Sequence, residues 1–196
     1  MNKNTIKKSL RFSISIAVIT LVLAAIFSIA STSVLSGTSW AIGLIIVFII
    51  VFIGVFFDMM GIAAAAASET PFHSMAAEKV PGSKQAIIIV RNADRFASFC
   101  NDVIGDIAGI VSGAASTLVV IQLAAVINTN GVDLQSVLNI ILTSIVAALT
   151  VGGKAFGKTL AMTKSTEIIL MAGKTVSFVE RNLHIRLLPE LKKQKK

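Results

Sequence analysis

Three acidic residues lie within apolar stretches of the chain, where an ionised side chain is costly unless it is solvated or paired. Asp102 and Asp106 are four positions apart, so they share one face of a helix. Two carboxylates so close repel each other, and in a medium of low dielectric they need a cation between them or a proton on one of them. Asp58 lies near the end of another apolar stretch, and antiparallel packing could bring all three to a similar depth.

Oxygen ligands of this kind suit Mg²⁺ or Ca²⁺, with water completing the coordination shell. The three acids therefore predict a divalent-cation site within the apolar stretches. Two other interpretations stay open. Lys154 or Arg95 could pair with the acids as a structural contact, or the acids could lie near enough to lipid headgroups to remain hydrated.

Few other residues suggest chemistry. A single cysteine excludes an intramolecular disulfide and a cysteine-based zinc site. His73 and His184 are far apart in the sequence, so a metal shared by the two histidines is not predicted. The chain lacks a phosphate-binding glycine loop, a nucleophile elbow and an HExxH motif. We therefore predict no catalytic residue and no enzymatic activity.

The composition indicates a membrane protein. Of the 196 residues, 55% are hydrophobic and only 14% are charged, against roughly 25% charged residues in soluble domains. A helix that spans a membrane needs about 20 apolar residues. The apolar runs are residues 12–35, 40–60 (fading into 63–67), 96–127 and 134–151. The chain therefore accommodates four membrane-spanning helices and excludes a large soluble catalytic domain.

The basic residues predict the orientation of these spans, because loops rich in Lys and Arg stay in the cytoplasm. Four of the 18 basic residues precede the first run, four lie between the second and third, and ten follow the fourth. The turn-like segments 36–39 and 128–133 carry none. We therefore predict a multi-pass protein of the cell (inner or plasma) membrane with cytoplasmic N- and C-termini. Because topology explains the positive charge, no nucleic-acid partner is predicted.

The first run permits a second interpretation. A basic start, an apolar core and small residues at 28–33 also describe a signal peptide. The run is longer than a typical signal core, which favours a retained helix. Either interpretation leaves the second run entering from the outside.

Two cytoplasmic segments look amphipathic. Residues 68–95 contain Pro71, Pro81 and Gly82, which predict a broken helical stretch. Residues 155–188 suggest a helix on the membrane surface, and the lysine-rich end would attract anionic lipids, although a solvated tail is an equal alternative. The apolar face of that helix would be formed by Ile168, Met171, Thr175, Val179 and Leu183.

Small residues recur at four-residue spacing on the third run. Gly105, Gly109 and Gly113 form a double GxxxG pattern. Such spacing allows two helix backbones to approach closely in lipid. The partner helix would belong either to the same protomer or to a second one.

Several short motifs resemble the transmembrane domain of the CNNM/CorC family. Residues 56–63 (Phe-Phe-Asp-Met-Met-Gly-Ile-Ala) resemble the motif that ends the first helix of that domain, and residues 92–96 (Asn-Ala-Asp-Arg-Phe) resemble the segment that opens the next one. Residues 109–114 resemble its glycine-rich helix, and residues 153–158 lie where the family has a Gly-Glu-x-x-Pro-Lys motif. The resemblance covers about residues 41–182.

The resemblance implies a fold and a function. Members of the family are magnesium transporters or exchangers, usually dimeric, with three membrane helices and a juxtamembrane helix. The expected fold is thus an all-α membrane protein with four transmembrane helices, the first being an addition, and cytoplasmic juxtamembrane helices. The expected division is an N-terminal helix (1–38), a CNNM-like domain (39–182) and a basic tail (183–196). No nucleotide-sensing domain is expected after the tail, and regulation through such domains would need a separate cytoplasmic protein.

Departures from the family pattern leave two hypotheses. Gly61 and Lys154 replace acidic residues of the family motifs, and Gly157 replaces a proline. In the leading hypothesis the protein binds or moves Mg²⁺ through a rebuilt site, as a homodimer in the lipid bilayer. In the alternative it is a non-transporting scaffold or regulatory subunit that has lost the ion site. The expected metal ligands are Asp58, Asp102 and Asp106, with Asn101 and the backbone carbonyls of Gly152 and Gly153 as secondary ligands.

Overall fold

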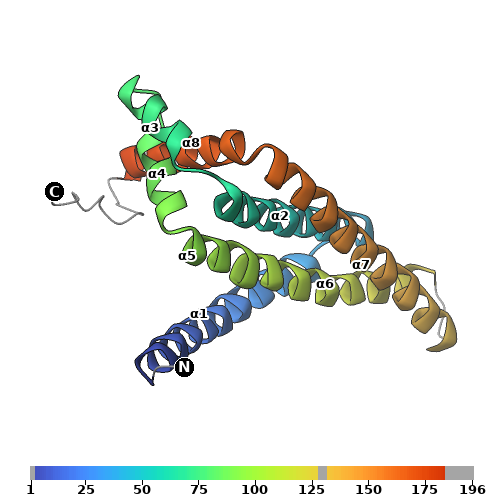
Figure 1. Ribbon diagram of the computed structural model, residues 1–196. Helices are drawn as coiled ribbons and strands as arrows, with labels where there is room; N and C mark the ends of the chain where they lie inside the picture. The colour runs from blue at the N-terminus through green and yellow to red at the C-terminus, as the bar shows by residue number, and fades with distance from the viewer. Residues whose placement is uncertain (1–2, 128–131, 184–196) are drawn as a thin grey trace. The chain divides into compact units, whose positions relative to one another are not determined.

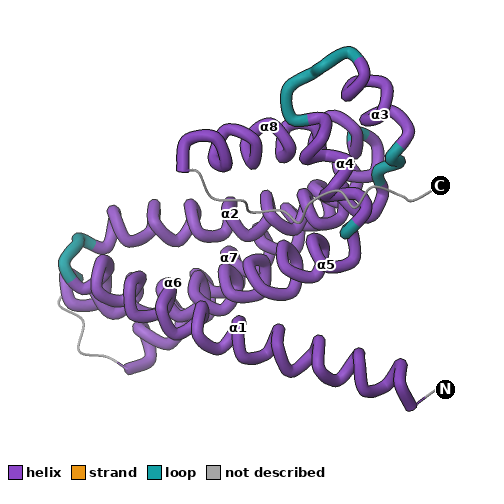
Figure 2. The backbone as a smooth tube through the Cα atoms, turned by 90° about the vertical axis from the view of Figure 1, so that its left-hand side faces the viewer, coloured by secondary structure: helices purple, strands orange, loops and turns teal. Residues whose placement is uncertain are grey.

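A computed structural model of the chain describes residues 3–127 and 132–183, and every secondary-structure element in these ranges is helical (Figure 2). The elements are α1 (Lys3–Ser36), α2 (Trp40–Ala66), α3 (Thr70–Ala77), α4 (Ser83–Arg91), α5 (Ala93–Ser98), the π-helix η1 (Phe99–Gly105), α6 (Asp106–Val126), α7 (Val132–Thr163) and α8 (Ser165–Leu183) (Figure 1). The predicted turn at 128–133 falls largely outside the described residues, and the tail from His184 onward falls wholly outside them.

Four helical stretches are long and apolar enough to span a membrane, which confirms the predicted number. They are Ser13–Ser36, Trp40–Ala66, Ala93–Val126 and Leu134–Thr163. The predicted end of the fourth run near residue 151 is wrong, because α7 continues for about three more turns to Thr163. Gly152 and Gly153 do not end the helix, since tertiary packing outweighs the modest helix cost of glycine.

The chain forms two compact units. The first consists of Met1–Phe56 and Asp102–Lys154, and the second of Phe57–Asn101 and Ala155–Lys196. Since α2 and α7 each contribute to both units, neither unit is a continuous stretch of sequence.

In the first unit, α1 and α2 pack on α6. Val103, Ile107 and Val111 are buried against apolar side chains of α1 and α2. Glycines on α2 allow its close approach to α6, because a Cβ at Gly54 would lie 2.8 Å from the Cβ of Ala108 and one at Gly43 would lie 2.9 Å from Val119. Many large apolar side chains of α1, α2 and α7 remain exposed, as expected for helices whose outer surface meets lipid.

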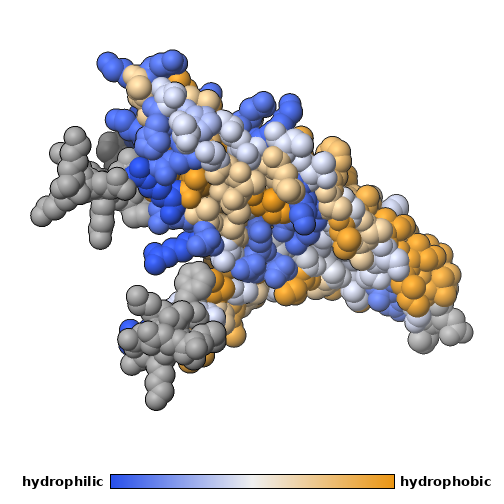
Figure 3. All heavy atoms as spheres, viewed as in Figure 1, coloured by the Kyte–Doolittle hydropathy of each residue, from blue (hydrophilic) through white to orange (hydrophobic). Residues whose placement is uncertain are grey.

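The second unit has its own apolar core. Phe72 of α3, Ile89 of α4 and Ile169 of α8 are fully buried in one cluster, which also includes alanines from the ends of α2 and α7. The predicted break in residues 68–95 is confirmed: Pro71 lies at the start of α3, and Gly82 adopts a left-handed conformation (φ +85°) immediately before α4. Figure 3 shows hydrophilic residues gathered over α3 and α4 on the face drawn.

The packing of α8 differs from the prediction. The predicted apolar face is wrong at Met171 and Thr175, which are exposed, whereas Ile168 packs against the core. The buried side passes through Ile169, Ala172 and Gly173. This side packs on α4: a Cβ at Gly173 would overlap the carbonyl oxygen of Gly82. The reason is that glycine and alanine permit backbone contact between the two helices, which a pattern of large apolar residues does not reveal.

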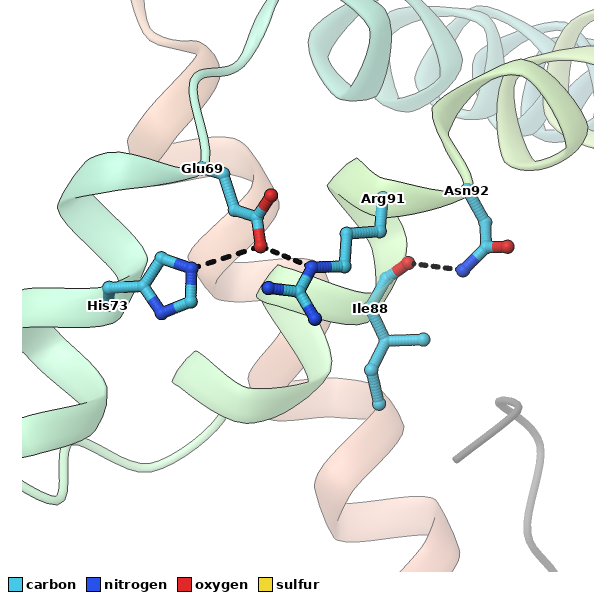
Figure 4. Close-up of polar contacts among 5 residues, drawn as sticks. All are labelled: Glu69, His73, Ile88, Arg91 and Asn92. Carbon is cyan, nitrogen blue, oxygen red and sulfur yellow. Dashed lines mark hydrogen bonds and ion pairs between the residues drawn. The ribbon is translucent and has the colours of Figure 1, made fainter. Parts of the chain in front are cut away.

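A polar cluster ties α3 to the end of α4. Glu69 accepts a hydrogen bond from the Nε of Arg91 and lies 3.0 Å from Nε2 of His73 (Figure 4). Asn92 donates from its side-chain amide to the carbonyl of Ile88 at 2.8 Å, which satisfies a carbonyl at the end of α4. These contacts link the short helices of the second unit to one another.

Candidate functional site

The two neighbouring carboxylates occur where the third span changes its winding. The span runs from Ala93 to Val126 and contains the π-helix η1, which holds Asp102, while Asp106 is the first residue of α6. Hydrogen bonds in a π-helix join residues five positions apart, and such insertions often occur at functional sites. The chemistry-bearing residues thus coincide with the one irregular part of this span.

Both carboxylates lie on the open side of the span. Asp102 and Asp106 are exposed, whereas Val103, Gly105 and Ile107 between and beside them are buried. The side chain of Asp106 retains 65% of its possible exposed surface. The buried positions are those that pack toward α1 and α2. The carboxylates are therefore accessible to a ligand within the first unit.

Lys154 of α7 is the charged neighbour of this pair. Its Nζ lies 3.9 Å from Oδ1 of Asp106, and its side chain is 28% exposed. The predicted structural pairing of Lys154 with an acid is therefore present for Asp106. The distance exceeds the roughly 2.7–2.9 Å of a charge-assisted hydrogen bond, so the contact is a loose ion pair.

Asn101, a predicted secondary ligand, lies in the second unit. Its side-chain Oδ1 is buried and has no hydrogen-bond partner among the described residues. The side chain occupies the space beside Gly61, where an added Cβ would overlap it. Gly61 is thus the position that leaves space for this amide.

The remaining predicted ligands have different settings. Gly153 lies inside α7, where its carbonyl is part of the regular helical ladder, and a Cβ there would lie 3.0 Å from Val55. Asp58 is half-buried and belongs to the second unit. The convergence of Asp58 with Asp102 and Asp106 stays a prediction. Across the described residues, no group of three or more His, Cys, Asp or Glu side chains is gathered to hold a metal ion.

Two of the three glycines in the GxxxG pattern on the third span do not pack within the first unit, whereas Gly105 is buried beside Gly54 of α2. A Cβ at Gly109 or Gly113 would meet nothing within 4 Å. The prediction that these two glycines pack within the protomer is therefore wrong for the described part of the chain. The open face continues from the carboxylates along these glycines, which leaves the backbone of α6 approachable.

Sequence reasoning missed the residues that build the contacts of α6 with α1 and α2. Gly43 and Gly54 make the close approaches, and Gln122 donates from Nε2 to the carbonyl of Leu35 at 2.7 Å. The two glycines are 11 positions apart, which is about three helical turns. That spacing could have identified them, whereas nothing local to Gln122 indicates its distant partner.

No protein-family model matches the chain, and no curated protein or solved structure matches it either. The resemblance to the CNNM/CorC family therefore rests on the short motifs alone.

Proposed function

We propose that this protein is a multi-pass membrane protein that binds a divalent cation, Mg²⁺ in the first instance, on the polar face of its third span and moves it across the membrane. The observation that carries the proposal is the pair Asp102 and Asp106, exposed together on a span where ionisable residues are otherwise costly. The two carboxylates would be direct or water-mediated ligands. Mg²⁺ is usually held by one or two carboxylates together with several waters, so two suffice.

The loose ion pair between Lys154 and Asp106 would be the state of this site when no cation is bound. Without the cation, the ammonium group of Lys154 offsets part of the negative charge at a distance of 3.9 Å from Asp106. A divalent cation carries twice the charge of that ammonium group and would displace it. Binding would then separate Lys154 from Asp106, which couples occupancy of the site to a change at α7.

The open face of α6 supports a proposal about assembly. We propose a homodimer in which a second copy covers Gly109 and Gly113, since both glycines face open space and small residues promote helix association in lipid. Such coverage would also keep the two carboxylates out of contact with hydrocarbon. The predicted orientation, with both termini cytoplasmic, follows from the distribution of Lys and Arg.

Mg²⁺ flux in proteoliposomes tests the proposal. We expect flux for the wild type, and a reduction of at least about tenfold for the double variant Asp102→Asn/Asp106→Asn, because both charged ligands are removed. Glu78→Gln is the matched control: it also neutralises one exposed acid, but at the end of α3, and it should leave flux unchanged. Equal flux in the double variant, or no flux above empty vesicles, would contradict the proposal.

The ion pair also favours one alternative function. If Lys154 is the permanent partner of Asp106, the protein would be a non-transporting scaffold or subunit that kept the helices and lost ion movement. Co-purification with a larger membrane protein, together with no Mg²⁺ binding, would favour this alternative. A wild type that carries Mg²⁺ flux without any partner would reject it.

A further inference from the structure

The first unit contains an apolar cavity of about 280 Å³ beside the third span. Its walls come from one face each of α1, α2 and the η1–α6 stretch, all within the same unit. Representative wall residues are Phe27, Val34, Ile50, Ile107 and Val111. The cavity lies on the side of α6 opposite to its exposed carboxylates, since Ile107 and Val111 are buried while Asp106 is exposed.

The connection between α1 and α2 explains why this space is left. Leu35 is fully buried at the end of α1, and its carbonyl accepts hydrogen bonds from Gln122 of α6 and from Thr38. This fixes the turn against α6 at one end. Beyond the turn, α1 contacts α6 through Leu23, and Figures 1 and 2 both show the N-terminal end of α1 departing from the neighbouring helices. Side chains of α1 and α2 therefore face each other without filling the space.

The apolar character of the lining indicates which kind of molecule the cavity can hold. Ser31 carries the one side-chain polar group in the lining, and every other wall residue is aliphatic, aromatic or alanine. An ion or an ordered water needs several polar partners, so this cavity is neither an ion path nor a hydrated pocket. Several wall residues are also open to the outside, among them Phe27 (52% exposed), Val34 (53%) and Ile53 (43%). In a membrane-spanning bundle that outside is the hydrocarbon of the bilayer.

We propose that this cavity holds one acyl chain of a membrane lipid. In other proteins an apolar cavity of about 150 Å³ stays dry and binds benzene, whereas pockets for drug-sized molecules measure roughly 300–1,000 Å³. A volume of about 280 Å³ exceeds the space that benzene occupies and accommodates a longer stretch of hydrocarbon. An occupied cavity regains the dispersion contacts that an empty one forfeits. The proposal does not depend on cation binding.

Photo-crosslinking with a lipid probe tests this proposal on the full chain. The protein is placed in nanodiscs of phosphatidylcholine and phosphatidylglycerol that contain a phosphatidylcholine with a diazirine on one acyl chain. After irradiation, the modified peptides are mapped by mass spectrometry, and lipid retained after detergent exchange is counted by native mass spectrometry. We expect crosslinks concentrated on the cavity walls and about one retained lipid per protomer.

Two substitutions on α1 give a matched comparison. Ala30 lines the cavity, whereas Ala25 is equally exposed and lies outside its lining. Ala30→Trp should reduce wall crosslinks and lipid retention by about fivefold or more, and Ala25→Trp should change neither. Ser31→Phe fills the cavity from a neighbouring position and provides a second variant if Ala30→Trp misfolds.

Three results would overturn the proposal. Crosslinks spread evenly over exposed positions of α7, such as Ile140 and Ile145, would mean that the probe reports only the general lipid surface. Unchanged retention in Ala30→Trp and Ser31→Phe would mean that the lipid lies elsewhere. If the probe forms no crosslink to the cavity walls and α1 of a second copy is mapped to the cavity instead, the space would belong to the dimer interface.

Discussion

Glycines of the second unit and glycines of the third span have opposite surroundings. In the second unit, a Cβ at Gly82 would lie 2.5 Å from the backbone nitrogen of Lys174, and one at Gly173 would overlap Gly82. On α6, Gly109 and Gly113 have nothing within 4 Å. Glycine thus permits close backbone packing around Gly82 and Gly173, the closed region, while the helix surface at Gly109 and Gly113, the open region, is uncovered. The closed region is packed by backbone contact between α4 and α8, whereas the open one lies along the exposed acids.

Alanine in the closed region should have the largest effect on stability. At Gly82 it would be strained by the positive φ, at about 1–2 kcal/mol, and it would overlap the backbone of α8, at roughly 1–3 kcal/mol. We expect Gly82→Ala and Gly173→Ala each to lower the free energy of unfolding by about 2–4 kcal/mol. Thermal unfolding in detergent measures this. A variant as stable as the wild type would show that α4 and α8 do not make this contact.

The polar cluster of the same unit should contribute less. Glu69 bridges Arg91 and His73 at the surface, and exposed ion pairs are worth roughly 0.2–1 kcal/mol. We therefore expect Glu69→Gln to destabilise the protein by less than about 1 kcal/mol. Adding salt should slightly lower the stability of the wild type and so reduce the difference in stability between the two proteins. A loss as large as that of Gly82→Ala would mean that the cluster, and not the glycine contact, holds the unit closed.

Alanine in the open region should have the smallest effect. Gly109→Ala and Gly113→Ala remove a flexible residue from a helix interior, where alanine is favoured by roughly 0.5–1 kcal/mol. We expect unchanged or slightly raised stability of the protomer, in contrast to the closed glycines. Gly113→Leu should lower the dimer fraction measured by crosslinking in nanodiscs, if a second copy covers this face. An unchanged dimer fraction would place the dimer interface elsewhere.

Hydropathy predicted the number of spans because each of the four runs is long and nearly free of charge. It did not predict where α7 ends, since Gly152 and Gly153 resemble a helix end and only contacts such as that of Gly153 with Val55 show otherwise. The π-helix was also hidden, because four-residue and five-residue hydrogen-bonding patterns leave similar side-chain spacing over one turn.

At the site too, patterns of neighbouring residues were predictable from the sequence, whereas contacts between distant residues were not. The spacing of Asp102 and Asp106 predicted two acids on one helix face, and both are indeed exposed on α6 and the turn before it. Lys154 and Arg95 were both candidate counter-ions in the sequence, and only the fold shows that Lys154 lies beside Asp106. Which glycines are open could not be predicted, because the pattern that allows packing is identical whether or not a partner is present.

Direct Mg²⁺ binding tests the central claim. Isothermal titration of the purified protein should show a site in the wild type, weakened at least about tenfold (about 1.4 kcal/mol) in Asp106→Asn. Lys154→Met should bind Mg²⁺ several-fold more tightly, because the competing ammonium group is removed from Asp106. No binding in the wild type, or equal affinity in all three proteins, would contradict a cation site on the third span.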